Sequence, residues 1–150
     1  MQRDTPLIQM PGHLIRRFHQ HATATFQNSV KSTGHDITPV QFATLATLAQ
    51  HPELDQATLA GLIAYDRATI GGVVKRLEQK GLISRNPSEK DRRAFRLALT
   101  PYGLTVLGEI TPIVSALQSD ILEGLSADEA HTLIRLMHKA LQMDPERDHR

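Results

Sequence analysis

The sequence predicts a mainly α fold that carries one small β-hairpin. Apolar residues recur at intervals of three and four along most of the chain, which is typical of amphipathic helices. The period changes to two at residues 94–99, where Phe95, Leu97 and Leu99 alternate with other residues. Just before this point, two short helices are expected to follow each other closely. We therefore expect a helix-turn-helix followed by a hairpin, or wing, with further helices at both ends.

The composition limits the class of protein. The chain has 150 residues, enough for one domain with a hydrophobic core. It has no cysteine, which excludes disulfides, thiol chemistry and thiolate zinc sites. We see no apolar run that could span a bilayer and no secretory signal, and expect a soluble, cytoplasmic protein that binds no membrane. No paired carboxylates or Gly-rich phosphate loop stand out, so we expect no enzymatic activity and no cofactor.

Start and stop signals delimit the first two helices. The first is expected to begin at Pro11 and to be stopped by Gly34. In the second, Thr38 is the N-cap, Pro39 the first helical residue and Gln41 the third. These three residues together form a capping box with proline.

Four further helices have comparable signals. Asp55 and Asp66 are expected to cap the two short helices of the helix-turn-helix. A long helix is expected over residues 101–125, with Pro112 kinking it rather than ending it. The last helix begins with the capping box of Ser126–Glu129.

Positive charge is concentrated in the middle of the chain. Residues 66–96 hold nine Lys or Arg and four acids, a net charge of +5, so the rest of the chain has a net charge of −4. A basic middle within an acidic frame is expected when one face meets a polyanion. A solvated charged surface would give the same count.

The second short helix has the pattern of a helix that reads DNA. Its apolar residues are spaced to face a core. They are Ile70, Val73, Val74 and Leu77. A helical wheel then places Ala68, Gly72, Lys75 and Gln79 most outward, flanked by Thr69, Gly71 and Arg76. Arg67 joins these candidates through its position at the N-terminus of the helix. Small residues would let this helix approach a major groove closely. Alternatively, Gly71 and Gly72 serve tight packing against another helix.

Within this group, position along the helix suggests different roles. N-terminal residues of a helix in the major groove meet base edges, so we expect Arg67 and Thr69 to read bases. We expect Lys75 and Arg76, further along, to contact phosphates.

The turn of the hairpin carries a second group of charges. The candidate DNA-binding residues here are Ser88, Lys90, Asp91, Arg92 and Arg93. An arginine at a hairpin tip can enter a narrow minor groove, where the negative potential is strongest. Asp91 is placed to orient the Arg93 guanidinium, and Lys90 and Arg92 would lie near phosphates. The alternative is a solvent-exposed ion pair, which contributes little energy.

Several segments of this region resemble the MarR family of winged helix-turn-helix regulators. They are Asp66-Arg67-x-Thr69, Leu77-Glu78-x-Lys80-Gly81-Leu82-Ile83-x-Arg85, Asp91-x-Arg93 and Leu97-x-Leu99-Thr100-x-x-Gly103. Upstream, "ITPVQFATLATL" and "QATLA" are similar to the family's second and third helices. The likeness is strongest over residues 37–103. Several independent segments at the right spacing are more specific than a single motif.

The resemblance implies a homodimer that binds a palindromic operator in double-stranded DNA, typically as a repressor. Residues 1–150 would form a single domain, with a DNA-binding module at 37–100 and dimerisation helices at 11–33 and 101–143. A two-fold dimer places its half-sites about one helical turn, roughly 34 Å, apart. A winged helix used only for protein–protein contact is the alternative, but it would not need a basic outward face.

The resemblance also implies a small aromatic carboxylate that releases the protein from DNA. We expect its site beside the first helix. The candidate ligand-binding residues are His13, Arg16, Arg17, Phe18, His21, Phe42 and Tyr65. An arginine can hold a carboxylate by two hydrogen bonds, and a histidine can bond a ring hydroxyl. Alternatively, the two arginines pair with acids across the dimer, such as Asp120 or Glu123. Phe42 and Tyr65 could equally belong to the core.

The eight histidines suggest another alternative, a zinc-responsive repressor of the same fold. His131 and His138 are seven residues apart on one helix, and His13, His19 and His21 cluster in the first. Zinc requires three or four ligands. No tight arrangement such as HxxxH is present, so we expect no metal site.

Overall fold

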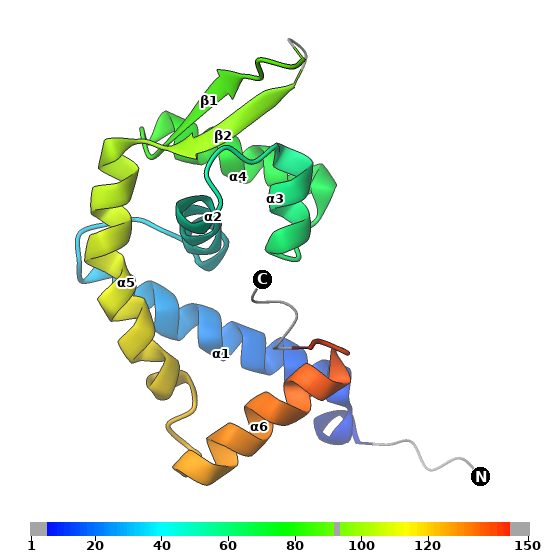
Figure 1. The fold of residues 1–150 in the computed structure, drawn as a ribbon. Coiled ribbons are helices and arrows are strands. Elements are labelled where there is room, and N and C mark those ends of the chain that lie inside the picture. Colours follow the sequence, from blue (N-terminus) through cyan, green and yellow to red (C-terminus); the bar gives the residue numbers. More distant parts are fainter. Residues whose placement is uncertain (1–5, 92–93, 145–150) are drawn as a thin grey trace. The chain divides into compact units, whose positions relative to one another are not determined.

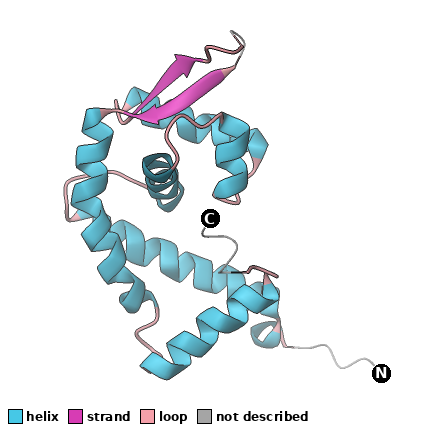
Figure 2. Cartoon of the chain, viewed as in Figure 1, coloured by secondary structure: helices cyan, strands magenta, loops and turns pink. Residues whose placement is uncertain are grey.

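The computed structural model describes residues 6–91 and 94–144 (Figures 1 and 2). Most of these residues are helical, and two strands form an antiparallel hairpin. The elements in chain order are the 3₁₀ helix η1 (Leu7–Gln9), α1 (Pro11–Lys31), α2 (Pro39–Gln50), α3 (Gln56–Leu62), α4 (Arg67–Gln79), β1 (Ile83–Pro87), β2 (Phe95–Leu99), α5 (Pro101–Ile121) and α6 (Ala127–Ala140). This order confirms the predicted fold class. The chain divides into two compact units, Met1–Leu117 and Gln118–Arg150.

The helices begin where the sequence signals place them, because side chains satisfy amide groups that a first helical turn leaves unpaired. At α2, the Thr38 hydroxyl accepts from the Gln41 amide at 3.3 Å, and the Gln41 side chain accepts from the Thr38 amide at 3.2 Å. At α4, the Asp66 carboxylate accepts from the Ala68 amide at 3.1 Å. Pro11 occupies the first position of α1. The start signals predicted at these three helices are thus confirmed. At α6, the Ser126 hydroxyl accepts from the Glu129 amide at 3.2 Å, which is one of the two bonds of the predicted capping box.

The core of the first unit is mainly aliphatic and draws on α1, α2, α3, α4, α5 and the hairpin. Its fully buried side chains include Leu45, Leu48, Leu59, Ile70, Leu77, Leu97 and Ile110. All four apolar residues predicted to face inward from α4 are buried. Burying an aliphatic side chain of this size stabilises the fold by roughly 1.5–3 kcal/mol. The four together therefore decide which side of α4 faces the core.

The hairpin is tied to the helices at its inner end. β1 and β2 pair in a register that sets Arg85 opposite Leu97. The alternation places Phe95, Leu97 and Leu99 on one face, as predicted. Leu97 is fully buried, and its amide donates to the Leu54 carbonyl in the loop between α2 and α3 at 2.7 Å. Phe95 lies beside the turn and is 46% exposed.

The start of α5 is held against the end of α4. The Thr100 hydroxyl donates to the Gly81 carbonyl at 2.6 Å and accepts from the Gly103 amide at 2.9 Å. Gly103 lies so close to the main chain of Leu82 that a Cβ atom at position 103 would be 2.0 Å from the Leu82 carbonyl oxygen. This approach of two backbones requires glycine.

The C-terminal end of α5 differs from the prediction. The helix continues through Pro112, which therefore does not end it. It stops at Ile121, four residues before the expected end. The following turn is closed by a tighter bond, from the Leu125 amide to the Leu122 carbonyl at 2.9 Å. Gly124 lies in this turn, and glycine is a poor helix former.

α1 and α6 keep several large apolar side chains exposed. In α1, Phe26 and Val30 are buried, whereas Leu14, Ile15 and Phe18 are exposed. In α6, which belongs to the second unit, no residue is buried. Its exposed apolar residues include Ile134, Leu136 and Met137. Among the described helices, none has both the length and the apolarity needed to cross a membrane.

Gly103→Ala should lower the free energy of unfolding by about 1–3 kcal/mol, because the added methyl group collides with the Leu82 backbone. Gly108→Ala in the same helix is the matched control. Nothing lies within 4 Å of a Cβ atom at position 108, so alanine should stabilise the helix by about 1 kcal/mol. Urea denaturation followed by circular dichroism measures both changes. Equal effects at the two positions would contradict the close backbone contact.

Candidate nucleic-acid interface

The outward side of α4 gathers most of the residues predicted to bind DNA. Six of them are exposed: Arg67, Ala68, Thr69, Gly72, Lys75 and Arg76. The N-terminus of the helix is closed by Asp66, whose carboxylate bonds the Ala68 amide and whose carbonyl accepts from the Thr69 hydroxyl at 3.1 Å. The exposed surface is therefore basic and built largely of short side chains.

The two glycines of α4 have different surroundings. A Cβ atom at Gly72 would meet nothing within 4 Å, whereas one at Gly71 would lie 3.4 Å from the side-chain nitrogen of Gln56 on α3. Within the described residues, tight helix packing does not explain glycine at position 72. Gly72 instead leaves the surface of α4 shallow at its centre.

α3 is fixed by its own cap. The Asp55 carboxylate accepts from the Thr58 amide at 2.7 Å and from the Thr58 hydroxyl at 2.8 Å. Both bonds favour the charged form of the carboxylate and so lower the pKa of Asp55. The bond from the amide has the larger effect and the bond from the hydroxyl the smaller one. α3 packs on α4, so its cap also supports the position of α4.

The turn of the wing is only partly described. Arg93, the predicted minor-groove residue, and Arg92, predicted to lie near phosphates, are both outside the described residues. Lys90 and Asp91 are exposed. Ser88 is buried, with 8% of its surface exposed, and its hydroxyl accepts from the Lys90 amide at 3.3 Å. Ser88 is therefore better placed to close the turn than to contact DNA, as the sequence had predicted for it.

Three cations of the basic segment are bonded within the protein. The Lys80 ammonium donates to the Asp36 carbonyl and, at 3.3 Å, to the Gln41 side chain. The Arg96 guanidinium donates to the Glu53 carbonyl at 3.0 Å. These partners lie more than 35 residues away in sequence, so no local pattern indicates them.

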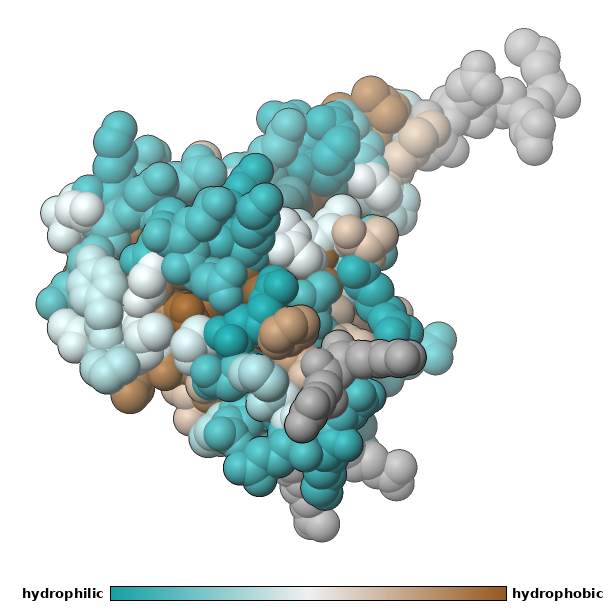
Figure 3. All heavy atoms as spheres, turned by 90° about the horizontal axis from the view of Figure 1, so that it is seen from above, coloured by the Kyte–Doolittle hydropathy of each residue, from teal (hydrophilic) through white to brown (hydrophobic). Residues whose placement is uncertain are grey.

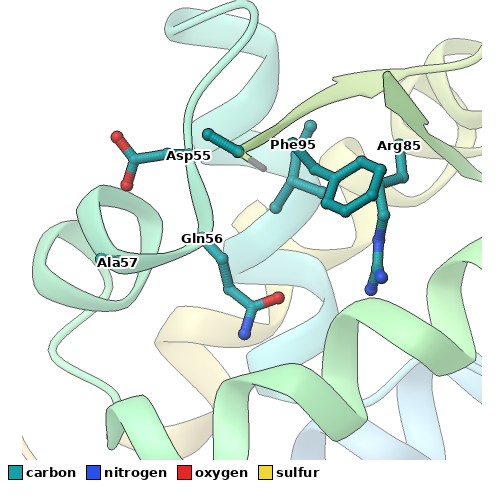
Figure 4. Close-up of a pocket in the computed structure, with 7 residues that line it drawn as sticks. Asp55, Gln56, Ala57, Arg85 and Phe95 are labelled. Carbon is teal, nitrogen blue, oxygen red and sulfur yellow. The ribbon is translucent and has the colours of Figure 1, made fainter. Parts of the chain in front are cut away.

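The third of these cations, Arg85, lies beside a hollow of about 230 Å³ between α3 and the hairpin (Figure 4). Its guanidinium carbon lies 5.4 Å from the centre of the Phe95 ring. Its Nε atom lies 3.9 Å from a carboxylate oxygen of Glu78 in α4. The side chain of Gln56 extends toward α4 from the other side of the hollow. Sequence analysis did not select Arg85 as a site residue.

The surface on this side of the molecule is mainly polar. Seen from above, the side on which Figure 1 draws the hairpin, hydrophilic residues cover most of the surface (Figure 3). Isolated apolar spots interrupt this surface. A polar, partly basic surface is suited to a charged, hydrated partner such as nucleic acid.

The residues predicted to bind a ligand fall into small local groups. In α1, an Arg16 guanidinium nitrogen lies 3.1 Å from Nδ1 of His13, and the rings of Phe18 and His21 are 6.1 Å apart. Arg17 is exposed. Phe42 is half-buried in α2 and packs against Phe26, with ring centres 6.2 Å apart. Tyr65, in the turn before α4, is 38% exposed.

The zinc alternative requires three or four ligands close together. Within residues 6–91 and 94–144, no three His, Asp or Glu side chains are grouped so that they could hold an ion. The described histidines thus give no support to a metal-responsive protein.

A helix-turn-helix with an exposed basic second helix and a two-stranded wing defines the winged helix-turn-helix class. The MarR family model matches residues 37–95. The chain is 33% identical to the transcriptional repressor NicR of Pseudomonas putida, over 92% of this chain and 86% of NicR. It is 36% identical to a putative regulatory protein for the hcr operon of Thauera aromatica, over 90% of this chain and 81% of the relative.

Solved structures agree with these relatives. BpsR of Bordetella bronchiseptica, whose DNA binding is regulated by 6-hydroxynicotinic acid, has a TM-score of 0.85 and 27% identity. The match covers 95% of this chain and all of that one. A mutant of MarR from Escherichia coli, complexed with operator DNA, has a TM-score of 0.80 and 26% identity, over 89% of this chain and 95% of that one. The chain belongs to the MarR family of winged helix-turn-helix transcriptional regulators.

Asp55→Ala should cost about 0.5–2 kcal/mol of stability near neutral pH, because α3 loses its N-cap. The folded pKa of Asp55 lies below its unfolded value of about 3.9, so its contribution is complete above about pH 5 and is lost as pH falls through the folded pKa. The difference in the free energy of unfolding between the parent and Asp55→Ala should therefore become smaller at low pH. Urea denaturation at a series of pH values measures this difference. Asp55→Asn, which can still cap, should cost less at neutral pH. A gap that stays constant down to about pH 2 would contradict this role.

Proposed function

We propose that this protein is a transcriptional repressor that binds a palindromic operator as a homodimer and is released by a small aromatic carboxylate. The observation that carries the DNA-binding part is the exposed basic side of α4, opposite its buried apolar residues. In this proposal, Arg67 and Thr69 read bases in the major groove, while Lys75 and Arg76 contact phosphates. The wing lies against the neighbouring minor groove, with the sequence-predicted Arg93 entering it.

A dimer supplies the second half of the binding surface. The exposed apolar residues of α1 and α6 support this part of the proposal, because such residues often mark protein–protein contacts. The dimerisation helices would be those of residues 11–33 and 101–143. A two-fold axis places the two copies of α4 about one helical turn of DNA, roughly 34 Å, apart.

The ligand part rests on the basic residues of α1. Arg16 beside His13, with Arg17 and His21 nearby in sequence, would offer a fork for a carboxylate and a partner for a ring hydroxyl. The relative regulated by 6-hydroxynicotinic acid supports this class of ligand. Release requires that the ligand binds the DNA-incompetent dimer more tightly than the competent one. Coupling of this kind typically weakens operator binding about 5- to 150-fold.

Lys75→Ala should weaken binding to a duplex taken from upstream of the protein's own gene, because one phosphate contact per subunit is lost. The slope of log affinity against log salt should fall by about 0.9 for each contact removed. Fluorescence anisotropy over a series of salt concentrations measures both quantities. Lys75→Arg, which keeps the positive charge at the same position, is the matched control and should keep the slope. A parent protein whose affinity does not depend on salt would refute the DNA-binding proposal.

Arg16→Ala and Arg17→Ala should together abolish release of the operator by aromatic acids. The measurement adds benzoate, salicylate, hydroxybenzoate, nicotinate or 6-hydroxynicotinate to the labelled complex and follows anisotropy. The alternative, pairing with Asp120 or Glu123 of a second subunit, predicts a different result. The variants would then dissociate into monomers more readily in analytical ultracentrifugation but respond fully to the acids. That outcome would contradict the proposal that Arg16 and Arg17 of α1 bind the ligand.

A further inference from the structure

Arg85 connects three elements of the DNA-binding module. It belongs to β1, its guanidinium lies over the ring of Phe95 in β2, and its Nε atom faces Glu78 in the last two turns of α4. About a third of its side-chain surface is exposed. A guanidinium suits this position because its flat face can stack on a ring while its edge is directed at a carboxylate.

Glu78 is otherwise difficult to explain in a DNA-binding helix. Its negative charge would repel phosphates, and it lies two and three residues after two proposed phosphate contacts, Arg76 and Lys75. Facing Arg85, the same charge helps to fix the guanidinium instead. Phe95 is similarly unusual, because a ring that is 46% exposed contributes less to the core than a buried one. Stacking under Arg85 gives this ring a defined contact.

Two hydrogen bonds of β2 lead to another part of the module, whereas β1 packs against α4. The Leu97 amide bonds the Leu54 carbonyl, and Arg96 bonds the Glu53 carbonyl. Both attach β2 to the loop between α2 and α3. The contact of Arg85 with Glu78 instead reaches from the hairpin to α4 itself (Figure 4 shows Arg85 beside Phe95).

We propose that Arg85 is a positioning residue that holds the wing at a fixed angle to α4, so that wing and helix meet the same DNA duplex together. The inference rests on the proposed DNA-binding function. It predicts that operator affinity depends on Phe95, an uncharged residue that needs no contact with DNA. Because stacking of this kind is modest, the expected effect is about 2- to 5-fold in affinity.

The first test needs no DNA. The chain has no cysteine, so Lys90→Cys gives one attachment point for a nitroxide spin label at an exposed residue of the wing turn. In electron paramagnetic resonance spectra, Arg85→Gln and Phe95→Leu should each increase the mobility of the label. Phe95→Tyr keeps the ring and should leave the spectrum unchanged. If neither Arg85→Gln nor Phe95→Leu changes the label, while circular dichroism shows both folded, the inference is wrong.

The second test measures operator affinity in the unlabelled protein. Arg85→Gln and Phe95→Leu should each weaken binding about 2- to 5-fold, and the double variant should be no weaker than the stronger single one, since both remove the same contact. If Arg85 bound phosphate directly, Arg85→Gln alone would weaken binding and lower the salt slope by about 0.9, with Phe95→Leu unchanged. That result would overturn the positioning role. Failure of the parent to bind DNA would refute the proposed function. The spin-label spectra would still show whether the contact between Arg85 and Phe95 restricts the motion of the wing.

Discussion

The burial of four aliphatic side chains from α4 is the constraint on which the winged helix-turn-helix depends. Ile70, Val73, Val74 and Leu77 together fix the rotation of the helix about its axis. Turning α4 by one residue position, about 100°, would bring Lys75 toward the core and expose part of the apolar stripe. The direction in which the small and basic residues of α4 face is thus a consequence of core packing.

Local features of the fold could be predicted because their causes are local. An N-cap such as Thr38 or Asp66 acts on amides two or three residues away, and the register of a hairpin follows the alternation of its residues. The period of apolar residues likewise gives the buried side of α4. For the same reason the candidate DNA-binding residues of α4 were accessible from the sequence alone, since their exposure depends only on that rotation.

Other features depend on pairs that are distant in sequence and have no local signature. The bond between Leu54 and Leu97 and the guanidinium of Arg96 on the Glu53 carbonyl each join residues more than 40 positions apart. Ser88 is a different case, because its hydroxyl accepts from the amide of Lys90, only two residues away, within the turn. Among the ligand candidates, the pairs His13–Arg16 and Phe18–His21 are three residues apart, which helix geometry brings together in any amphipathic helix.

Contacts that the sequence does not reveal also change how the positive charge of residues 66–96 should be understood. Counting Lys and Arg treats every cation as available to a polyanion, but Lys80, Arg85 and Arg96 already contact acceptors or a ring within the protein. Moving them to phosphates would break these contacts and loosen the wing. In the proposed DNA complex, α4 and the wing can therefore make fewer phosphate contacts than the charge count suggests, unless the protein rearranges. Part of the positive charge supports the shape of the surface, and only the remainder is available to attract DNA as proposed.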